Sequence, residues 1–355
     1  MRAYVIDGGF GFERLKIIER PMPSPQPGEV LLRMRAASLN YRDLRMVTGA
    51  YNPAQPLPLV PLSDGVGEVI AIGPGVTRVA LGDCAAPILV QKWVAGEPEP
   101  GVFDSLLGGP LDGVAAEYAV FPEVGVVKIP AYLSDVEAAT FTVAGVTAWM
   151  ALTGLGTVRA GDWVLVQGTG GVAIFALQLA KLFGANVILT SSSDAKLARA
   201  QALGADRLIN YRATPAWGAL VRDYTGGRGV ANVIEVGGAA TLVQSLLAVR
   251  WGGQISRIGY LSGHALDPTL VPEFERQQQA DPFALLIATL TARIQGIASG
   301  HRTDFEALLR AAEQHRLKPV VDRAFRFEEL PAALAYLERG VHFGKVCLDF
   351  GVPAA

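Results

Sequence analysis

Unbroken apolar runs alternate with amphipathic segments from residue 162 onward, and this alternation predicts an α/β domain. The apolar runs are expected to be strands at residues 163–167, 186–190, 207–210, 230–236 and 254–258. Helical spacing of apolar residues lies between them, at residues 172–183, 195–203, 215–224 and 239–249. Strands buried on both faces show no polar alternation, so this repeating order predicts a doubly wound parallel sheet.

The first third of the chain has a different residue pattern, in which short runs of β-favouring residues are separated by proline and glycine. The expected strands lie at residues 2–6, 29–36, 67–72 and 116–121, and a Gly/Pro-rich surface loop at residues 87–113. A helix at residues 305–315 and short strands ending at residues 345–350 follow the α/β region. This last piece is too small to stand alone and is expected to fold back onto the first domain. We therefore predict one domain from residues 1–130 and 302–355, and a second from residues 131–301.

Composition supports a folded chain with a large core. Half of the 355 residues are hydrophobic and 18% are charged, which is the opposite of a disordered composition. With 31 Lys and Arg against 33 Asp and Glu, the net charge is −2. This near-neutral balance gives no bulk attraction for phosphate backbones, so nucleic acid is not an expected partner.

Cysteine and histidine usage predicts no metal site. Cys84 and Cys347 cannot build a disulfide framework or a thiolate-rich zinc site, and the four histidines are scattered. The first ten residues lack the apolar core of a signal peptide. The uncharged stretch at residues 138–158 contains several glycines and threonines and is interpreted as a buried segment rather than a membrane span. These features favour a cytoplasmic protein that does not act at a membrane.

The strongest local signal is a glycine-rich turn between the predicted strand 163–167 and the predicted helix that follows it. The turn reads Gly168-Thr-Gly170-Gly171-Val172-Ala173. Glycines here let a pyrophosphate approach backbone N–H groups at a helix N-terminus, and the fingerprint allows alanine at its third glycine. We therefore predict that this turn, through Gly168, Gly170, Gly171 and Val172, binds a dinucleotide.

The end of the second strand distinguishes NAD from NADP. An NAD site places Asp or Glu there for the ribose hydroxyls, and that carboxylate repels a 2′-phosphate. This chain has serines, including Ser191 and Ser192, followed by Asp194 and Lys196. Hydroxyls and an ammonium suit a phosphate, and Asp194 is expected to cap the next helix. NADPH is thus favoured over NADH, although Lys196 could instead be a solvated lysine.

The strand predicted at residues 254–258 ends at Gly259 and Tyr260. Open α/β sheets bind their ligands at the carboxyl ends of the strands. Gly259 and Tyr260 are therefore expected to contact the same cofactor.

Together, these motifs resemble the zinc-independent medium-chain dehydrogenases/reductases, close to quinone oxidoreductases and zinc-free alcohol dehydrogenase-like members. The resemblance covers nearly the whole chain and implies a GroES-like, mostly-β catalytic domain split around a Rossmann domain. Besides the glycine turn, the matching segments are Ser38-Leu-Asn40-Tyr-Arg-Asp43-Leu, Gly67-Glu-Val69, Gly82-Asp83, Ala144-Gly-Val-Thr147-Ala, Ile209-Asn-Tyr211-Arg, Ile234-Glu-Val-Gly237-Gly and His342-Phe-Gly-Lys345-Val.

The resemblance also implies catalytic residues. It places Asn40 near the nicotinamide and the substrate, with Tyr51 across the cleft. The alternatives are that Asn40 satisfies a buried turn and that Tyr51 lines a loop. Asp43 is interpreted as a structural hydrogen-bond acceptor rather than a proton donor.

Further cofactor contacts follow from the same resemblance. It implies that Thr147 lies against the nicotinamide and Tyr211 beside the 2′-phosphate, and Gly237 and Lys345 are assigned to the cofactor as well. Thr147 could instead bond back to its own helix, Tyr211 could be an ordinary strand-end aromatic, and Lys345 could be solvated.

Departures from the zinc-dependent relatives shape the expected chemistry. Those enzymes carry a catalytic Cys where Asn40 stands and a His-Glu pair where Ser63 and Asp64 stand. Without a Lewis acid, hydride transfer from NADPH to an activated C=C bond or a quinone is favoured, because the charge spreads onto an oxygen that neutral donors can hold.

Two other functions stay open: a zinc-free alcohol dehydrogenase or carbonyl reductase, and a non-catalytic NADPH-binding protein. In each case the partner is a small molecule. A homodimer is also expected, with the apolar segment at residues 283–291 as the candidate contact.

Overall fold

The computed structural model describes residues 1–154, 158–263 and 291–351, which form two compact units. Unit 1 comprises Met1–Val146 and Ser299–Ala355, and unit 2 comprises Thr147–Ala298. The candidate dimer contact was predicted at residues 283–291. Of these, residues 283–290 lie outside the described part of the chain.

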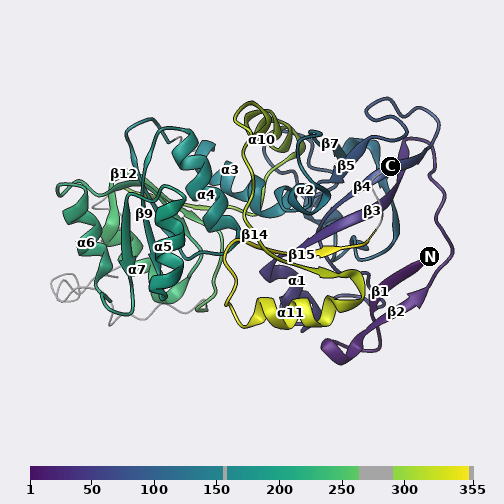
Figure 1. Ribbon diagram of the computed structural model, residues 1–355, viewed down its shortest axis with the longest axis horizontal. Helices are drawn as coiled ribbons and strands as arrows, with labels where there is room; N and C mark the ends of the chain where they lie inside the picture. The colour runs from purple at the N-terminus through teal and green to yellow at the C-terminus, as the bar shows by residue number, and fades with distance from the viewer. Residues whose placement is uncertain (155–157, 264–290, 352–355) are drawn as a thin grey trace. The chain divides into compact units, whose positions relative to one another are not determined.

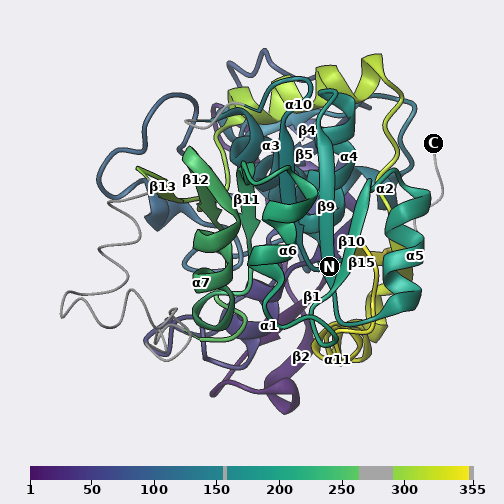
Figure 2. The same ribbon diagram turned by 90° about the vertical axis from the view of Figure 1, so that its left-hand side faces the viewer.

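Unit 2 is built on a six-stranded parallel sheet with the order β10-β9-β8-β11-β12-β13. Its elements are α3 (Val146–Thr153), β8 (Trp163–Gln167), α4 (Gly171–Leu182), β9 (Asn186–Ser191), α5 (Asp194–Ala202), β10 (Arg207–Asn210), α6 (Trp217–Tyr224), β11 (Val230–Glu235), α7 (Ala239–Ala248), β12 (Val249–Arg257) and β13 (Arg293–Gly296). In Figure 2, β13, β12, β11, β9 and β10 follow one another across the view. The strand order reverses beside β8, which is where doubly wound sheets bind ligands.

The predicted doubly wound sheet is confirmed, and the expected strands and helices of unit 2 lie within a few residues of the observed ones, apart from an earlier start of β12. Their centres are buried apolar residues such as Leu165, Ile188 and Val233, which join one core cluster. The sequence did not predict β13. This four-residue edge strand is half-buried or exposed and includes Arg293 and Gln295, so it lacks the apolar run of a central strand.

Unit 1 contains a seven-stranded sheet with the order β14-β15-β3-β4-β5-β7, and β6 also pairs with β3. A separate hairpin of β1 (Arg2–Ile6) and β2 (Leu15–Glu19) lies beside it (Figure 1). The other elements are β3 (Glu29–Leu39), α1 (Tyr41–Val47), β4 (Asp64–Ile72), β5 (Cys84–Pro87), β6 (Tyr118–Pro122), β7 (Val126–Lys128), α2 (Asp135–Ala138), the π-helical turn η4 (Phe141–Gly145), α10 (Arg302–Gln314), β14 (Val321–Arg326), α11 (Leu330–Glu338) and β15 (Lys345–Asp349).

The returning C-terminal segment completes the unit 1 sheet. Strand β15 lies between β14 and β3, parallel to the former and antiparallel to the latter. This confirms that the last part of the chain folds back onto the first. Helix α11 packs on the same sheet, and its Leu334 shares a core cluster with Met34 and Val346.

The domain limits differ from those expected. The units divide after Val146 and before Ser299, rather than after residue 130 and before residue 302. The segment between residues 131 and 146 stays with unit 1 because α2 packs against β3, β4 and β15, and η4 packs against β4. The helical stretch Asp135–Thr153 is long and apolar enough to cross a membrane, but 72% of its 18-residue apolar window is buried inside the protein.

Candidate active site

The glycine turn of unit 2 has the geometry of an anion-binding helix start. Gly168 has a φ of 75°, a left-handed conformation that side chains rarely adopt, and its N–H donates to Thr190 O at 2.8 Å. Helix α4 begins after Gly170, and no side chain caps it among the residues that the structure describes. Its first N–H groups are thus suited to a pyrophosphate, and this part of the chain fits a dinucleotide.

At the end of β9, the helix cap is Ser193 rather than Asp194. The Ser193 hydroxyl accepts from Lys196 N at 3.4 Å, so the prediction that Asp194 caps α5 was wrong. Asp194 lies in the first turn of α5, where its carboxylate accepts from Asn210 Nδ2 at 2.7 Å. Ser191 is buried, and its hydroxyl accepts from the Ser193 backbone N–H at 3.2 Å.

The remaining residues predicted around the 2′-phosphate also come together. Tyr211 follows β10, with 41% of its surface exposed, and its N–H donates to Ser191 O at 3.1 Å. Ser192 and Lys196 are half-buried on the same turn and on the first turn of α5. Ser191 and Tyr211 thus lie at the ends of the neighbouring strands β9 and β10, with Ser192 directly after β9 and Lys196 in the first turn of α5.

The ends of β11 and β12 complete this edge of the sheet. Gly237 is packed so closely that a Cβ would lie 2.3 Å from the Thr241 hydroxyl, and a Cβ on Gly259 would lie 2.7 Å from Val236 O. Tyr260 follows Gly259 and has 41% of its surface exposed. Gly259 is therefore required by close packing against the Val236 backbone, and Gly237 by close packing against the Thr241 side chain. Thr147 is buried near the start of α3.

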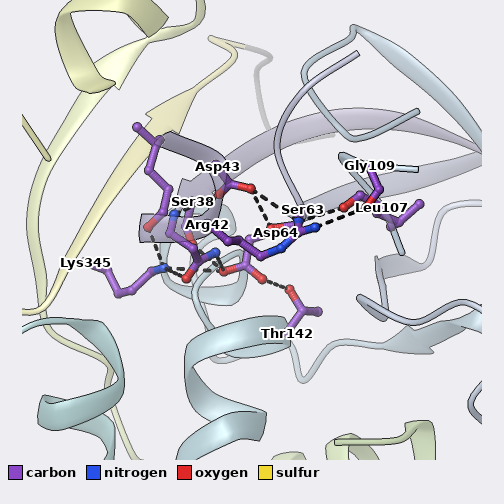
Figure 3. A network of polar contacts seen from close by, with 11 residues as sticks. Ser38, Arg42, Asp43, Ser63, Asp64, Leu107, Gly109, Thr142 and Lys345 are labelled. Atoms are coloured by element: carbon purple, nitrogen blue, oxygen red, sulfur yellow. Dashed lines mark hydrogen bonds and ion pairs between the residues drawn. The ribbon is translucent and has the colours of Figure 1, made fainter. Parts of the chain in front are cut away.

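A buried polar cluster in unit 1 is centred on Asp64, the first residue of β4 (Figure 3). The Asp64 carboxylate accepts from Ser38 Oγ and from Asn40 Nδ2 at 2.8 Å each, and from the Thr142 hydroxyl. It also forms a 3.4 Å ion pair with Lys345 Nζ at the start of β15. Both groups are buried, so each requires a partner of opposite charge or a hydrogen-bond partner, and the cluster supplies both.

Asn40 is held in one orientation by this cluster. Its Oδ1 accepts from Lys345 Nζ at 2.7 Å, while its Nδ2 donates to Asp64 at 2.8 Å. Lys345 also donates to Leu39 O at 2.8 Å, so three acceptors meet its three N–H groups. An amide nitrogen has two N–H groups, and Asp64 uses one of them. The other is the group that Asn40 can offer to a ligand.

Asp43 supports the same loop. Its carboxylate accepts from Asn40 N and from Ser63 Oγ, at 2.8 Å each. Burial raises the pKa of Asp43, although Arg42 and these hydrogen bonds act in the opposite direction. Asp43 is thus a hydrogen-bond acceptor that holds the backbone at the start of α1 and the side chain of Ser63, the neighbour of Asp64.

Tyr51 lies against the side chain of Arg42 rather than in the Asp64 cluster. The Arg42 guanidinium lies 5.0 Å from the centre of the Tyr51 ring and donates to Leu107 O and Gly109 O at 2.8 and 3.2 Å. Tyr51 has 41% of its surface exposed. The ring is therefore positioned by a cation–π contact while part of the residue stays accessible to solvent.

The residues around Asp64 do not fit a zinc ion. Zinc takes thiolate, imidazole and carboxylate ligands, whereas Asp64 is surrounded by hydroxyls, an amide and the cation Lys345. Among the described residues, no group of three or more His, Cys, Asp and Glu side chains could hold a metal ion.

Two family models match the chain. The model described as an alcohol dehydrogenase GroES-like domain covers residues 26–131, and the one described as a zinc-binding dehydrogenase covers residues 171–314. The chain is 40% identical over 351 residues to a zinc-type alcohol dehydrogenase-like protein of Schizosaccharomyces pombe, with 98% of this chain and 99% of the relative covered. It is 32% identical over 360 residues to an acryloyl-coenzyme A reductase of Metallosphaera sedula, covering 98% and 99%.

Solved structures of similar proteins also match nearly the whole chain. An NAD-dependent alcohol dehydrogenase superposes with a TM-score of 0.86 at 36% identity, covering 99% of this chain and 100% of the other. A mycobacterial protein in complex with NADPH superposes with a TM-score of 0.78 at 25% identity, covering 98% and 99%. Both structures are of proteins whose descriptions name a pyridine nucleotide.

Proposed function

Since the chain belongs to the medium-chain dehydrogenase/reductase family of NAD(P)-dependent oxidoreductases, we propose that it uses NADPH, without zinc, to reduce an activated C=C bond or a quinone. The observation that carries this proposal is the Asp64 cluster, where an ammonium and neutral donors stand in place of metal ligands. An acryloyl-coenzyme A reductase among the relatives is consistent with a C=C substrate.

The chain's own residues would hold the charge that develops on the substrate. Bound NADPH supplies the hydride. The free N–H of Asn40 donates to the oxygen that becomes negative, and Lys345 keeps the amide from turning its carbonyl toward that oxygen. We therefore treat Lys345 as a positioning residue rather than as the cofactor ligand expected from the sequence.

Neutral donors match a conjugated acceptor better than an isolated carbonyl. Hydride addition to an enone or quinone delivers electrons to a system that spreads the charge, whereas addition to a simple ketone leaves a localised alkoxide that a Lewis acid stabilises best. A carbonyl reductase is the second candidate, because relatives described as alcohol dehydrogenases match nearly the whole chain.

The test is NADPH oxidation measured against quinones, enones, aldehydes and imines, followed by product analysis with an enone. A saturated ketone supports the proposal. An allylic alcohol would show that the enzyme reduces C=O instead, and cofactor binding with no turnover across the panel would indicate a non-catalytic binding protein.

We expect Lys196→Met to separate the two cofactors. If Ser191, Ser192, Lys196 and Tyr211 surround a 2′-phosphate, losing the ammonium should weaken NADPH binding by about 1–3 kcal/mol, the scale of a charge-assisted hydrogen bond. Binding of NADH should stay nearly unchanged. Titration of both nucleotides by calorimetry gives the comparison, and equal losses would show that Lys196 acts only on the fold.

Activity should survive exhaustive chelation. The side chains around Asp64 supply no thiolate or imidazole, so removal of divalent metal should leave turnover with the best substrate unchanged. Elemental analysis of the purified protein should find no stoichiometric zinc. One tightly held zinc per chain, with activity lost when it is removed, would contradict the assignment of Asn40 and Asp64.

A further inference from the structure

A second buried carboxylate lies in unit 2, at the carboxyl end of β11. The side chain of Glu235 is fully buried. Its Oε1 accepts from Gly237 N at 2.8 Å, Gly238 N at 3.0 Å and Thr241 Oγ1 at 2.6 Å. The carboxylate therefore fixes the path of the loop that joins β11 to α7.

The other oxygen of Glu235 meets Gln167, the last residue of β8 before the glycine turn. Gln167 Nε2 donates to Glu235 Oε2 and to Ser245 Oγ at 2.7 Å each, and the Ser245 hydroxyl donates to the same Oε2. Gln167 Oε1 accepts from Val236 N and Gly237 N at 3.3 Å each. One amide and one carboxylate thus link the ends of the two central strands.

This network has a single allowed direction. The backbone N–H groups of Val236, Gly237 and Gly238 can only donate, so the oxygens that face them must be Gln167 Oε1 and Glu235 Oε1. That leaves Gln167 Nε2 as the donor between the two side chains and Glu235 Oε2 as the acceptor. Turning the Gln167 amide over places its NH2 group against the N–H groups of Val236 and Gly237, a donor against donors in a buried site, which costs free energy.

We propose that Gln167 and Glu235 are positioning residues for the dinucleotide: their directional hydrogen bonds hold the glycine turn and the loop after β11 in the geometry that binds it. The inference rests on pyridine-nucleotide binding at the glycine turn, and not on a preference for NADPH or on any substrate. It deepens the proposed function by naming side chains that set the site without lining it.

Exchanging the two groups provides the test. In Glu235→Gln, every orientation of the new amide faces a donor, either Gln167 Nε2 or the loop N–H groups. In Gln167→Glu, two carboxylates face each other in the position that now has a 2.7 Å hydrogen bond. In the double variant, the amide introduced at position 235 would donate to the carboxylate introduced at position 167. The contacts with the loop N–H groups and with Ser245 would then all be satisfied again, with the same net charge.

We expect each single variant to lose affinity for the nucleotide and the double variant to regain it. Each single change should raise the Kd of both NADPH and NADH by about tenfold or more, since an unmet buried donor has that scale of effect. The double variant should return to within about threefold of wild type. Calorimetric titration gives the Kd, and the Tm of the nucleotide-free protein gives a readout that needs no cofactor.

Asn232→Asp is the matched control. Asn232 lies on the same strand, is fully buried and donates to Ala151 O at 2.6 Å, away from both loops. This variant should lower the Tm by a few degrees, as the single changes do, while the Kd of either nucleotide stays within about twofold of wild type.

Several outcomes would overturn the inference. If the single variants have a lower Tm but bind nucleotide with the wild-type Kd, the network is purely structural. A double variant no better than the worse single variant, in Kd and in Tm, would contradict the directional arrangement. If wild type prefers NADH, the proposed cofactor preference fails. The ratio of each variant's Kd to the wild-type Kd still tests the inference.

If wild type binds neither nucleotide, both the proposed function and the positioning role fail.

Discussion

The variant Asn40→Ala is expected to have a kcat at least about a hundredfold below wild type on the best substrate. Removing one donor to a developing oxyanion raises the barrier by about 2.7–4 kcal/mol. The affinity for NADPH should fall much less, because the amide is proposed to act on the substrate oxygen. Steady-state kinetics and calorimetric titration of NADPH on the same preparation measure the two effects.

Two further variants sharpen this prediction. Asn40→Asp should be as damaging as alanine, because it removes the donor and places a carboxylate where an amide lies 2.8 Å from Asp64. Tyr51→Phe should cost less, since Tyr51 is exposed and water can replace its hydroxyl. An Asn40 variant with near-normal kcat would make this residue a turn-former rather than a catalytic donor.

Lys345→Met is expected to lower the free energy of unfolding by about 3–5 kcal/mol, because it leaves the buried carboxylate of Asp64 without its cation. The same change releases the Asn40 carbonyl, so kcat should also fall. Urea unfolding and steady-state kinetics measure these losses. Lys128→Met is the matched control: its 2.6 Å pair with Asp83 has a lysine side chain that is 63% exposed, and its loss should cost less than about 1 kcal/mol.

Combining Lys345→Met with Asp64→Asn separates stability from catalysis. Removing both buried charges should restore much of the lost stability, because a buried ion pair contributes little beyond an uncharged pair of similar size. The kcat should stay low, since the ammonium that holds the Asn40 carbonyl is then absent. Recovery of kcat together with stability would show that Lys345 serves only the fold.

The sequence predicted the dinucleotide half of the molecule well because its signals are local. A continuous apolar strand, a glycine turn and a helix follow one another within residues 163–182, and each has its own pattern. Helix α1 was missed in a region where only strands were expected, although Asn40 and Asp43 have the spacing of a capping pair. The Asp194 cap failed because two capping residues were adjacent and the first, Ser193, was used.

The Asp64 cluster could not be predicted from spacing, because its members come from distant parts of the chain. Asp64 and Lys345 are 281 residues apart, and no local pattern links them. The available signal was a lysine at the start of the apolar run Val346–Leu348, where a buried charge requires a partner. Likewise, Gln167 and Glu235 each end an apolar strand, but only the sheet order brings β8 and β11 together.

The position of β15 has a consequence for protein synthesis. Lys345 is made 305 residues after Asn40, which at about 5–20 residues per second is an interval of about 15–60 s. During that time the nascent unit 1 lacks a strand of its sheet and the cation that Asp64 requires. A ribosome that stops before β15 therefore releases a chain with an open sheet edge and an uncompensated carboxylate. We expect such a chain to be a substrate for chaperones and proteases rather than a partly active enzyme.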